Sequence, residues 1–294
     1  MMRILITVLI ISGVNRSFGQ DQEALFAFDY MLAPMGESDI DFYKTGFKAA
    51  IPTKLKKGVL TNSVGLNYYR LDYNDRNYDF FLEDLTAIYN LNYSLGYEHL
   101  LSKKWSLNGE AMVSVSSNLT NTITRDDLIF SGSFFATHKI GTETKPAKLM
   151  FGLSYTALLG SPFFMPVFNY IKQVNSKLSY GVGFPNTYVN YNVNERSGLK
   201  ASILMDGVYS NLSNKIPVNI NDEATKASYI SIDTGIEYNY RMDDFWVVSF
   251  TGGYSLYNNY TLENSFGDDV YNFEATSRPF FSAGIKFNLK SNKD

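Results

Sequence analysis

Residues 230–241 read ISIDTGIEYNYR, and the character of the side chains changes at every second position. One set of positions holds Ile230, Ile232, Thr234, Ile236, Tyr238 and Tyr240, and the other holds Ser231, Asp233, Gly235, Glu237, Asn239 and Arg241. Successive side chains of a β-strand point to opposite faces, so a period of two predicts a strand. This strand has one apolar face and one polar face.

The same alternation recurs around residues 89–98, 199–210, 246–257 and 281–289. In residues 246–257, the apolar set is Trp246, Val248, Phe250, Gly252, Tyr254 and Leu256, and it alternates with Val247, Ser249, Thr251, Gly253, Ser255 and Tyr257. Repeated amphipathic strands are typical of transmembrane barrels, which turn apolar side chains to lipid and polar ones to the lumen. The sequence therefore predicts an all-β fold, a closed antiparallel transmembrane β-barrel. Closure pairs every backbone group that lipid cannot satisfy.

Short turns and long polar loops connect the predicted strands in alternation. Short turns fall at 101–103, 175–176, 194–196 and 242–243, and long loops at 73–83, 118–126, 212–225 and 260–277. Transmembrane barrels have short periplasmic turns and longer extracellular loops, so placing both termini of the chain in the periplasm puts every long loop outside with an even number of strands. The predicted strands are 24–33, 41–52, 58–72, 84–100, 104–117, 127–140, 147–158, 163–174, 177–183, 186–193, 197–211, 226–241, 244–259 and 278–290.

The number of strands depends on the hairpin around Phe184-Pro185-Asn186. Proline cannot donate to a ladder, and Pro-Asn favours a turn. If this short hairpin folds into the lumen, the wall has twelve strands; if it stays in the wall, there are fourteen. The prediction is therefore a barrel of 12 to 14 strands.

Aromatic residues on the apolar faces fit the predicted orientation. Trp105 and Trp246 begin strands at the periplasmic side, and Tyr97, Tyr238, Tyr240 and Phe287 end strands there. Tyrosine and tryptophan favour membrane interfaces because one end of the ring system is apolar and the other is hydrated. These positions predict an interfacial girdle.

The first residues are predicted to be an export signal. Arg3 precedes an apolar run from Ile4 to Ile11, and Ser17-Phe18-Gly19 supplies the small residues of a cleavage site. Residues 1–19 are therefore predicted to be a signal peptide, cleaved near Gly19. Residues 20–294 are then a single barrel domain in the cell outer membrane.

Composition excludes several classes of function. The chain of 294 residues has 26 basic and 29 acidic residues, so no basic surface favours nucleic acid. There is no cysteine, which removes disulfides, thiolate metal sites and cysteine catalysis. Aromatic residues make up 16% of the chain, whereas there are two histidines, so histidine-rich metal chemistry is not expected.

Several motifs carry a resemblance to a known kind of family. They are the signal ending Ser17-Phe18-Gly19-Gln20, the stretch 29–34 (DYMLAP), Ala50-Ile51-Pro52, Gly183-Phe184-Pro185 and the closing strand 281–287. Together they resemble uncharacterised outer-membrane β-barrel families of Bacteroidetes-type Gram-negative bacteria, described as domains of unknown function. The resemblance implies an outer-membrane barrel and carries over no catalytic residue. The sequence departs from the usual ending of such barrels, because Asn288 to Asp294 follow Phe287.

The sequence contains two candidates for a catalytic or metal site. A lipid hydrolase needs a serine activated by a histidine, and neither His99 nor His138 has a serine at same-face spacing on its own strand. In the first long loop, Asp72, Asn74 and Glu83 match positions 1, 3 and 12 of a calcium loop. Arg76 and Asn77 stand where a ligand and a turn glycine are needed. We therefore predict that the chain is not an enzyme and holds no metal or cofactor.

Charged residues on the polar faces are the remaining candidate site. They are predicted to line the lumen: Glu98, Glu110, Lys139, Lys148, Lys200, Asp206, Asp233, Glu237, Arg241 and Lys286. Their balance leaves two interpretations open, a water-filled pore with mild ion selectivity or a narrow interior plugged by pairing.

The sequence thus favours a passive pore or transport channel for small solutes. The alternatives are a structural or surface-binding barrel without a conducting lumen, an outer-membrane lipid hydrolase, and an exported β-sandwich or lipocalin-like binder whose apolar faces meet in a core. The expected partners are outer-membrane lipid, small solutes and the barrel-insertion machinery, and not nucleic acid.

Overall fold

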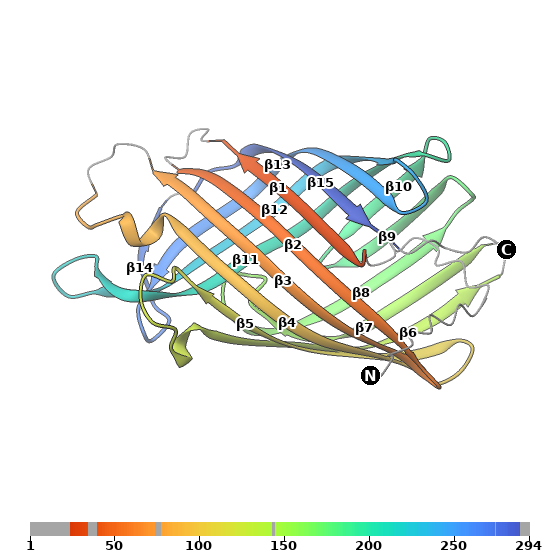
Figure 1. Ribbon diagram of the computed structural model, residues 1–294, viewed down its shortest axis with the longest axis horizontal. Helices are drawn as coiled ribbons and strands as arrows, with labels where there is room; N and C mark the ends of the chain where they lie inside the picture. The colour runs from red at the N-terminus through yellow and green to blue at the C-terminus, as the bar shows by residue number, and fades with distance from the viewer. Residues whose placement is uncertain (1–23, 35–39, 74–77, 143–144, 274, 289–294) are drawn as a thin grey trace, which may run out of the picture.

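The computed structural model describes residues 24–34, 40–73, 78–142, 145–273 and 275–288, and its strands wind around a long axis (Figure 1). The predicted signal peptide lies outside the described residues. Two single-turn 3-10 helices, η1 (Glu83–Leu85) and η2 (Arg125–Asp127), sit among the loops. The strands are β1 (Phe26–Ala33), β2 (Ile40–Leu55), β3 (Gly58–Tyr73), β4 (Ala87–Leu100), β5 (Trp105–Ser117), β6 (Leu128–Gly141), β7 (Pro146–Thr156), β8 (Phe163–Gln173), β9 (Leu178–Phe184), β10 (Thr187–Asn192), β11 (Ser197–Pro217), β12 (Glu223–Arg241), β13 (Trp246–Glu263), β14 (Asp269–Asn272) and β15 (Arg278–Phe287).

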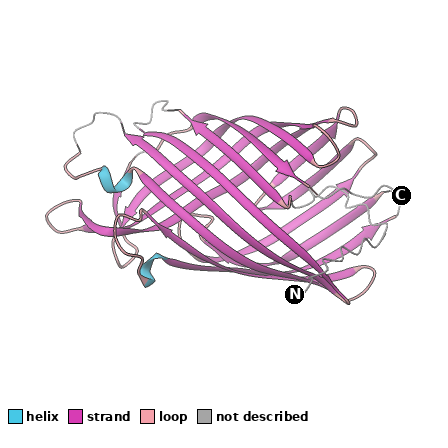
Figure 2. Ribbon diagram, viewed as in Figure 1, coloured by secondary structure: helices cyan, strands magenta, loops and turns pink. Residues whose placement is uncertain are grey.

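These strands form a closed antiparallel barrel (Figure 2). Each strand from β1 to β13 pairs with the next, and β15 joins β13 to β1, so fourteen strands make the wall. The short strand β14 pairs with the end of β13, beyond the residues of β13 that pair with β15, and is not counted among the fourteen. The β9–β10 hairpin lies in the wall, because β9 pairs with β8 and β10 with β11. Fourteen strands are therefore confirmed, and the twelve-strand alternative is wrong.

The two ends of the barrel differ, as the loop lengths predict. Long loops, β14 and both 3-10 helices gather at the left of Figure 1, which we call the long-loop end. The β2–β3 turn and the later short turns lie at the opposite, short-turn end, where Phe26 of β1 also pairs with Phe287 of β15. Backbone hydrogen bonds link neighbouring short turns, for example Leu100 N to Lys57 O at 2.7 Å.

Three strands extend beyond their predicted bounds at the long-loop end. The segment 212–225 was expected to be a loop, but β11 runs to Pro217, β12 starts at Glu223, and only 218–222 form the turn. Likewise β13 continues to Glu263. Leu212 and Ile216 are buried, so this extension has a core of its own.

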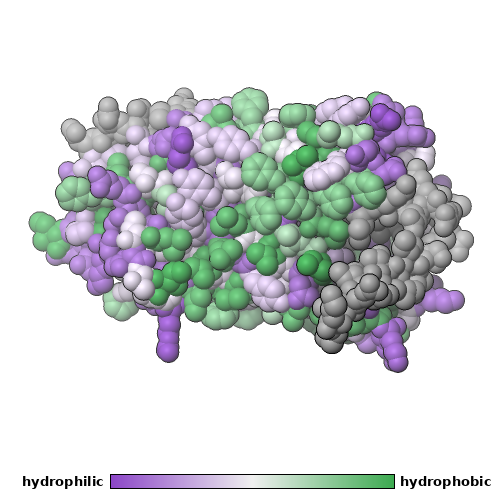
Figure 3. Space-filling model, viewed as in Figure 1, coloured by the Kyte–Doolittle hydropathy of each residue, from purple (hydrophilic) through white to green (hydrophobic). Residues whose placement is uncertain are grey.

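An apolar belt covers the outside of the barrel nearer the short-turn end. Phe134 and Phe250 lie on the outer face of their strands and expose 59% and 55% of their surface. Figure 3 shows apolar residues across the middle of the visible face, with hydrophilic residues gathered at the long-loop end. Contiguous exposed apolar surface of this extent is typical of contact with a bilayer.

The polarity of the two faces inverts toward the long-loop end. In β3, the outward Val64 and Leu66 are exposed while the inward Ser63 is buried; farther along, the inward Leu71 is 2% exposed and the outward Arg70 pairs with Asp72 at 2.7 Å. Our prediction of polar inward faces along whole strands is therefore wrong in this half. A wall with water outside buries its apolar side chains inside, as soluble barrels do.

This outer half has a continuous hydrophobic core inside the barrel. Its members come mainly from β1–β4, from β11–β13 and from the segments next to β14: Ala33, Ile40, Phe42, Tyr69, Leu71, Phe80, Leu85, Ile88, Val208, Leu212, Ile216, Val218, Ala224, Ala227, Tyr229, Tyr260, Leu262, Phe273 and Phe280. We call these residues the outer core.

The outer half is narrower than the ring of fourteen strands because β5 and β11 meet directly. Ser117 of β5 and Asn211 of β11 form a parallel bridge, and Asn118 N donates to Asn211 O at 3.4 Å. The shorter strands β6–β10 end below this contact. Toward the long-loop end, the wall thus continues as a smaller barrel that does not include β6–β10.

One bulge corrects a predicted facing. Ile232 pairs with Tyr257 and Asp233 with Ser255, so Leu256 is the extra residue in β13. A bulge places two successive residues opposite one. Tyr257 therefore lies on the outer face beside Leu256, and not on the inner face as strict alternation predicts.

Candidate functional site

The candidate site is the interior of the barrel between the short-turn end and the outer core. Strand alternation and register place all ten predicted residues on the inner face: Glu98 and Glu110 on β4 and β5, Lys139 and Lys148 on β6 and β7, Lys200 and Asp206 on β11, Asp233, Glu237 and Arg241 on β12, and Lys286 on β15. Ser63, Ser94, Ser106 and Ser249 share this face. Small polar and charged groups therefore dominate the interior on the side of the short turns.

The structure brings several of these charges together in pairs. Glu237 faces Lys200 across β11 and β12, its carboxylate lies 3.5 Å from Lys286 Nζ, and it accepts a hydrogen bond from Asn239. Lys139 and Lys148 face one another directly on β6 and β7. Like charges in opposed positions repel, so these two lysines favour contact with water or an anion.

An ion pair spans the interior. Lys44 Nζ of β2 lies 2.5 Å from Asp206 Oδ2 of β11, and β12, β13, β15 and β1 separate these two strands around the ring. The two side chains are 17% and 30% exposed. The pair therefore ties opposite walls together across the lumen.

Sequence reasoning missed Lys44, together with the inward Asp29, Lys48 and Arg278. Asp29 shares one face of its strand with Ala27 and Met31, and Phe28 and Tyr30 occupy the other face. This alternation could have placed Asp29 on the inner face. Lys44 and Lys48 flank Gly46 at the same period. No local signal shows that Lys44 reaches Asp206, because 162 residues separate the two.

Aromatic side chains of the outer core fill the interior just beyond the ion pair. Phe42 of β2 stacks on Tyr229 of β12 with ring centroids 4.6 Å apart. Tyr73 of β3 donates to Tyr260 of β13 at 3.2 Å, and both rings pack on Phe273. These contacts join strands on different sides of the outer half, and the aromatic rings that make them belong to the outer core or pack against it.

The other side of the β5–β11 contact is also occupied. The β7–β8 turn packs on the faces of β11 and β12 that point away from the outer core. Gly160 O accepts a hydrogen bond from Ser228 Oγ at 2.8 Å, and a Cβ atom at Gly207 would come within 2.4 Å of Leu158 O. The glycine at 207 therefore permits this close approach.

Polar groups hold β5 and β11 together. Asn211 Nδ2 donates to Asp127 Oδ1 at 2.8 Å, and Thr124 N donates to Asp127 Oδ2 at 2.5 Å. Ser117 Oγ lies 3.2 Å from Ser213 Oγ. Burial opposes the charge of Asp127, but the hydrogen bonds from Thr124, Ser117 and Asn211 outweigh it and hold the pKa of this carboxyl below its ordinary value. We call this group of residues the β5–β11 clasp.

Both histidines lie at the short-turn end on the outer face. His138 stacks on Trp105 with ring centroids 4.2 Å apart, and His99 Nδ1 lies 3.1 Å from Tyr97 Oη. Each histidine ring thus has an aromatic neighbour. Trp246 packs edge-on against Phe287 at the same end, where the sequence places the girdle.

No cluster of three or more metal-binding side chains is found within the ranges that the structure describes. Of the candidate calcium loop, Asn74, Arg76 and Asn77 lie outside those ranges, and Asp72 pairs with Arg70. The described part of the chain contains no helix that is both long and apolar enough to cross a membrane.

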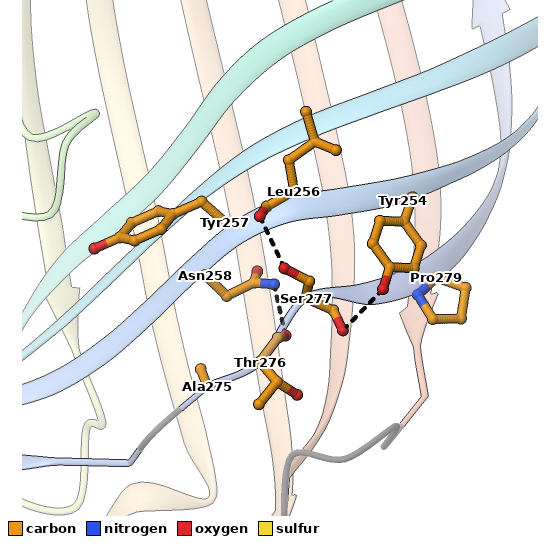
Figure 4. A pocket seen from close by; sticks show the side chains of 8 residues that line it. All are labelled: Tyr254, Leu256, Tyr257, Asn258, Ala275, Thr276, Ser277 and Pro279. Carbon is orange, nitrogen blue, oxygen red and sulfur yellow. Dashed lines mark hydrogen bonds between the residues drawn. The ribbon is translucent and has the colours of Figure 1, made fainter.

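A shallow groove marks the outer surface beside the bulge in β13 (Figure 4). Tyr254, Leu256 and Tyr257 line one side, and residues 275–277 and Pro279 line the other. Side chains bridge the two: Ser277 Oγ donates to Leu256 O at 2.8 Å and Asn258 Nδ2 donates to Thr276 O at 3.0 Å. These side-chain bonds replace the backbone ladder where β13 has left β15.

Comparisons with known proteins place the chain in a family without an assigned activity. No curated protein matches it. Solved structures with similar architecture include the KdgM porin (7% identity, TM-score 0.39, 90% of this chain and 99% of that chain), the NanC porin (12%, 0.41, 89% and 100%) and LpxR from Salmonella typhimurium (9%, 0.38, 90% and 99%). A family model described as a domain of unknown function matches residues 38–288, and the chain therefore belongs to this family, DUF6268.

Proposed function

We propose that this chain is an outer-membrane β-barrel whose lumen is closed in its outer half, and that it serves as a structural or surface-binding barrel. The observation that carries the proposal is the contact between opposite walls, the Lys44–Asp206 ion pair and the Phe42–Tyr229 stack beyond it. Interiors of packed side chains leave few voids as large as a water molecule. Ions that enter from the short-turn end therefore meet a closed outer half.

The membrane location rests on the exterior. The apolar belt would be costly in water, because about 25 cal/mol is lost per Å² of apolar surface left exposed. Aromatic rings at the short-turn end have the composition of an interfacial girdle. The periplasmic position of the short turns follows from the same orientation.

The surface role is supported by the tips of three outer loops. Ile220, Phe266 and Phe81 are exposed by 102%, 89% and 87%, and they lie in the β11–β12 turn, the β13–β14 turn and the β3–β4 loop. Exposed apolar residues at loop tips on a rigid scaffold are common in recognition surfaces. The outer half would thus be a rigid support for these loops.

The test is electrical recording from refolded protein in planar bilayers. The wild-type barrel is expected to give no steady current. A variant that hollows the outer core, Phe42→Ala with Tyr229→Ala, is expected to conduct, and Phe134→Ala on the outer belt serves as a matched aromatic control that stays closed. Steady wild-type current, or a hollowed variant that folds and stays silent, would contradict the proposal.

The second candidate is a passive pore for small solutes. The inner face of the half nearer the short turns favours it, because the ten predicted residues are five acids and five bases with serines between them. Rings of charged side chains produce mild ion selectivity in open pores. Steady current with weak selectivity in the wild type is the result that this candidate requires.

We further propose that the chain is not a lipid hydrolase. His99 and His138 contact Tyr97 and Trp105, and neither contact supplies a nucleophile. Reconstituted protein is expected to leave phospholipid and lipid A unchanged. Cleavage that disappears in a His99→Ala or His138→Ala variant would overturn this expectation.

A further inference from the structure

Four consecutive turns at the short-turn end carry an arc of lysines. The lysines belong to the β2–β3, β4–β5, β6–β7 and β8–β9 connections and the strand ends beside them: Lys54, Lys56, Lys57, Lys103, Lys104, Lys145, Lys172 and Lys177. All are exposed except Lys172, which is half-buried. Glu143 is the one acidic residue of these connections in the sequence. We call these eight residues the lysine arc.

Backbone hydrogen bonds at the turns and the pairing of β7 with β8 hold the parts of the arc side by side. Leu100 N donates to Lys57 O at 2.7 Å, Lys139 N to Lys104 O at 2.8 Å, and Asn192 N to Lys177 O at 2.8 Å. Each bond joins one turn to the end of the strand that leads into the next short turn. The described residues bring no carboxylate into ion-pair contact with any lysine of the arc.

The rest of the rim has a different charge. The β10–β11 turn contains Glu195 beside Arg196, and the β12–β13 turn contains Asp243 and Asp244. Asp243 Oδ1 accepts hydrogen bonds from the backbone N–H groups of Phe245 and Trp246, each at 2.8 Å. Among the described turns, the excess of positive charge therefore lies on the side formed by β2–β9.

Aromatic residues fix the depth of the arc. Trp105 follows Lys104 directly and stacks on His138, and Tyr97 lies on the neighbouring strand. Such rings sit at the level of lipid headgroups, with the apolar belt on one side and water on the other. The lysines next to them therefore reach the headgroup layer, and their stems can lie along the apolar surface.

We infer that the lysine arc binds the headgroups of anionic phospholipids in the leaflet that surrounds the short-turn end. The eight ammonium groups lie where phosphate groups are densest, and none of them has a carboxylate within ion-pair distance among the residues that the structure describes. Basic residues near an anionic bilayer surface are attracted to it. The inference rests on the proposed membrane location. It goes beyond that location by naming the class of lipid that is bound and the side of the barrel that binds it, since the β12–β13 side lacks the arc.

The two tryptophans make this inference testable within one protein. Trp105 lies beside the arc, Trp246 lies beside Asp243, and the chain has two tryptophans in all. The full chain with Trp246→Phe reports on the arc, and the full chain with Trp105→Phe reports on the acidic side. Each is placed in vesicles of phosphatidylcholine and phosphatidylglycerol in which one of the two lipids carries brominated acyl chains, which quench tryptophan fluorescence.

Trp105 is expected to be quenched more by brominated phosphatidylglycerol than by brominated phosphatidylcholine, with a preference of at least about twofold that falls as salt is added. Trp246 is expected to show little preference. Lys103→Gln with Lys104→Gln should remove most of the Trp105 preference, whereas Lys215→Gln at the long-loop end, which also removes positive charge, should leave it intact.

Equal quenching of Trp105 by both lipids in correctly inserted protein would overturn the inference, and the arc would then fit an acidic periplasmic protein instead. An equally strong preference at Trp246 would overturn its confinement to one side. Protein that does not float with the vesicles would count against the membrane location itself. Flotation and the mobility of unheated protein on gels show that each variant is inserted and folded.

Discussion

At the scale of single residues, the contact between Lys44 and Asp206 decides how the interior is organised. It joins β2 to β11 at 2.5 Å, and it lies between polar side chains toward the short turns and the aromatic outer core. Ion pairs with little exposure gain their attraction only when both partners are present, because each charge has lost water. Removing one partner therefore leaves the other charge poorly solvated.

We expect Lys44→Met to lower the free energy of unfolding by about 1–3 kcal/mol. The double variant Lys44→Met with Asp206→Leu should lose less free energy of unfolding than the sum of the two single variants, because neither charge is left without its partner. Urea titration of the refolded protein measures all three values. Additive losses would show that the two side chains do not interact in the membrane-bound barrel.

Asp127 of the β5–β11 clasp predicts a dependence on pH. Its pKa is held below the ordinary value of 3.8, so the folded state favours the ionised form. The stability that this group provides is fully present above pH of about 4 and is lost as the pH falls through the lower folded pKa. Hydrogen exchange at the amides of β11 near Asn211 should therefore accelerate on acidification below that pH.

In an Asp127→Asn variant this acid-dependent acceleration should be smaller, and exchange at neutral pH should already be faster. The expected loss of local stability is about 1–2 kcal/mol, the usual cost of weakened buried hydrogen bonds. Asp79→Asn, an exposed position in the β3–β4 loop, is the matched control. An unchanged acid response in Asp127→Asn would assign the dependence to another group.

At the scale of elements, the lengths of the strands shape the barrel. Strands β6–β10 have 6–14 residues each, whereas β11, β12 and β13 have 21, 19 and 18. The long strands continue past the end of the short ones, and β11 then meets β5. The outer half is thus a smaller barrel with a core that a soluble protein would have.

A cross-link tests the meeting of β5 and β11. The chain has no cysteine, so Ser117→Cys with Ser213→Cys introduces a single pair, at positions whose side-chain oxygens are 3.2 Å apart. We expect this pair to form a disulfide in the folded barrel under mild oxidation, because the sites are within reach of one. Non-reducing gel electrophoresis of membrane fractions detects it.

The control pair is Ser106→Cys with Ser213→Cys, because Ser106 lies near the other end of β5. No cross-link is expected there. If the first pair also fails to react in protein that is folded, β5 and β11 do not meet and the outer half is wider than the structure shows.

At the scale of the whole molecule, the exterior and the interior exchange character along the axis. Apolar side chains are outside near the short turns and inside near the long loops, and the inversion occurs within single strands such as β3. The membrane location proposed above would explain this pattern: with a bilayer around one half and water around the other, each half turns its apolar face away from water.

This pattern predicts that the protein resists extraction by alkaline carbonate and is released from membranes by detergent. An exported protein of the β-sandwich or lipocalin type would be released by carbonate alone, since its apolar faces meet in an internal core. Immunoblots of washed membranes separate the two outcomes. A peripheral protein and an unrelated outer-membrane barrel provide the reference fractions.

The sequence by itself determined the strands, their order and the face that each residue takes over most of the chain. It did so because alternation and turn composition are local properties that depend on neighbours one or two positions away, as in 230–241. The fourteen predicted strands correspond to the fourteen of the wall. The sequence left twelve strands open as well, and the pairing of β9 and β10 with their neighbours decided the number. The inner-face positions of the ten charged residues follow from the same local pattern.

Only the tertiary structure decided what the interior contains. The Lys44–Asp206 pair, the Phe42–Tyr229 stack and the β5–β11 contact join residues that are far apart in the sequence. Their meeting depends on the curvature of the sheet and on which strands outlast their neighbours. The bulge at Leu256 and the inverted polarity of the outer half also depend on the tertiary structure. Alternation tells which side of the wall a residue faces, but it does not tell whether lipid, water or another part of the wall lies on that side.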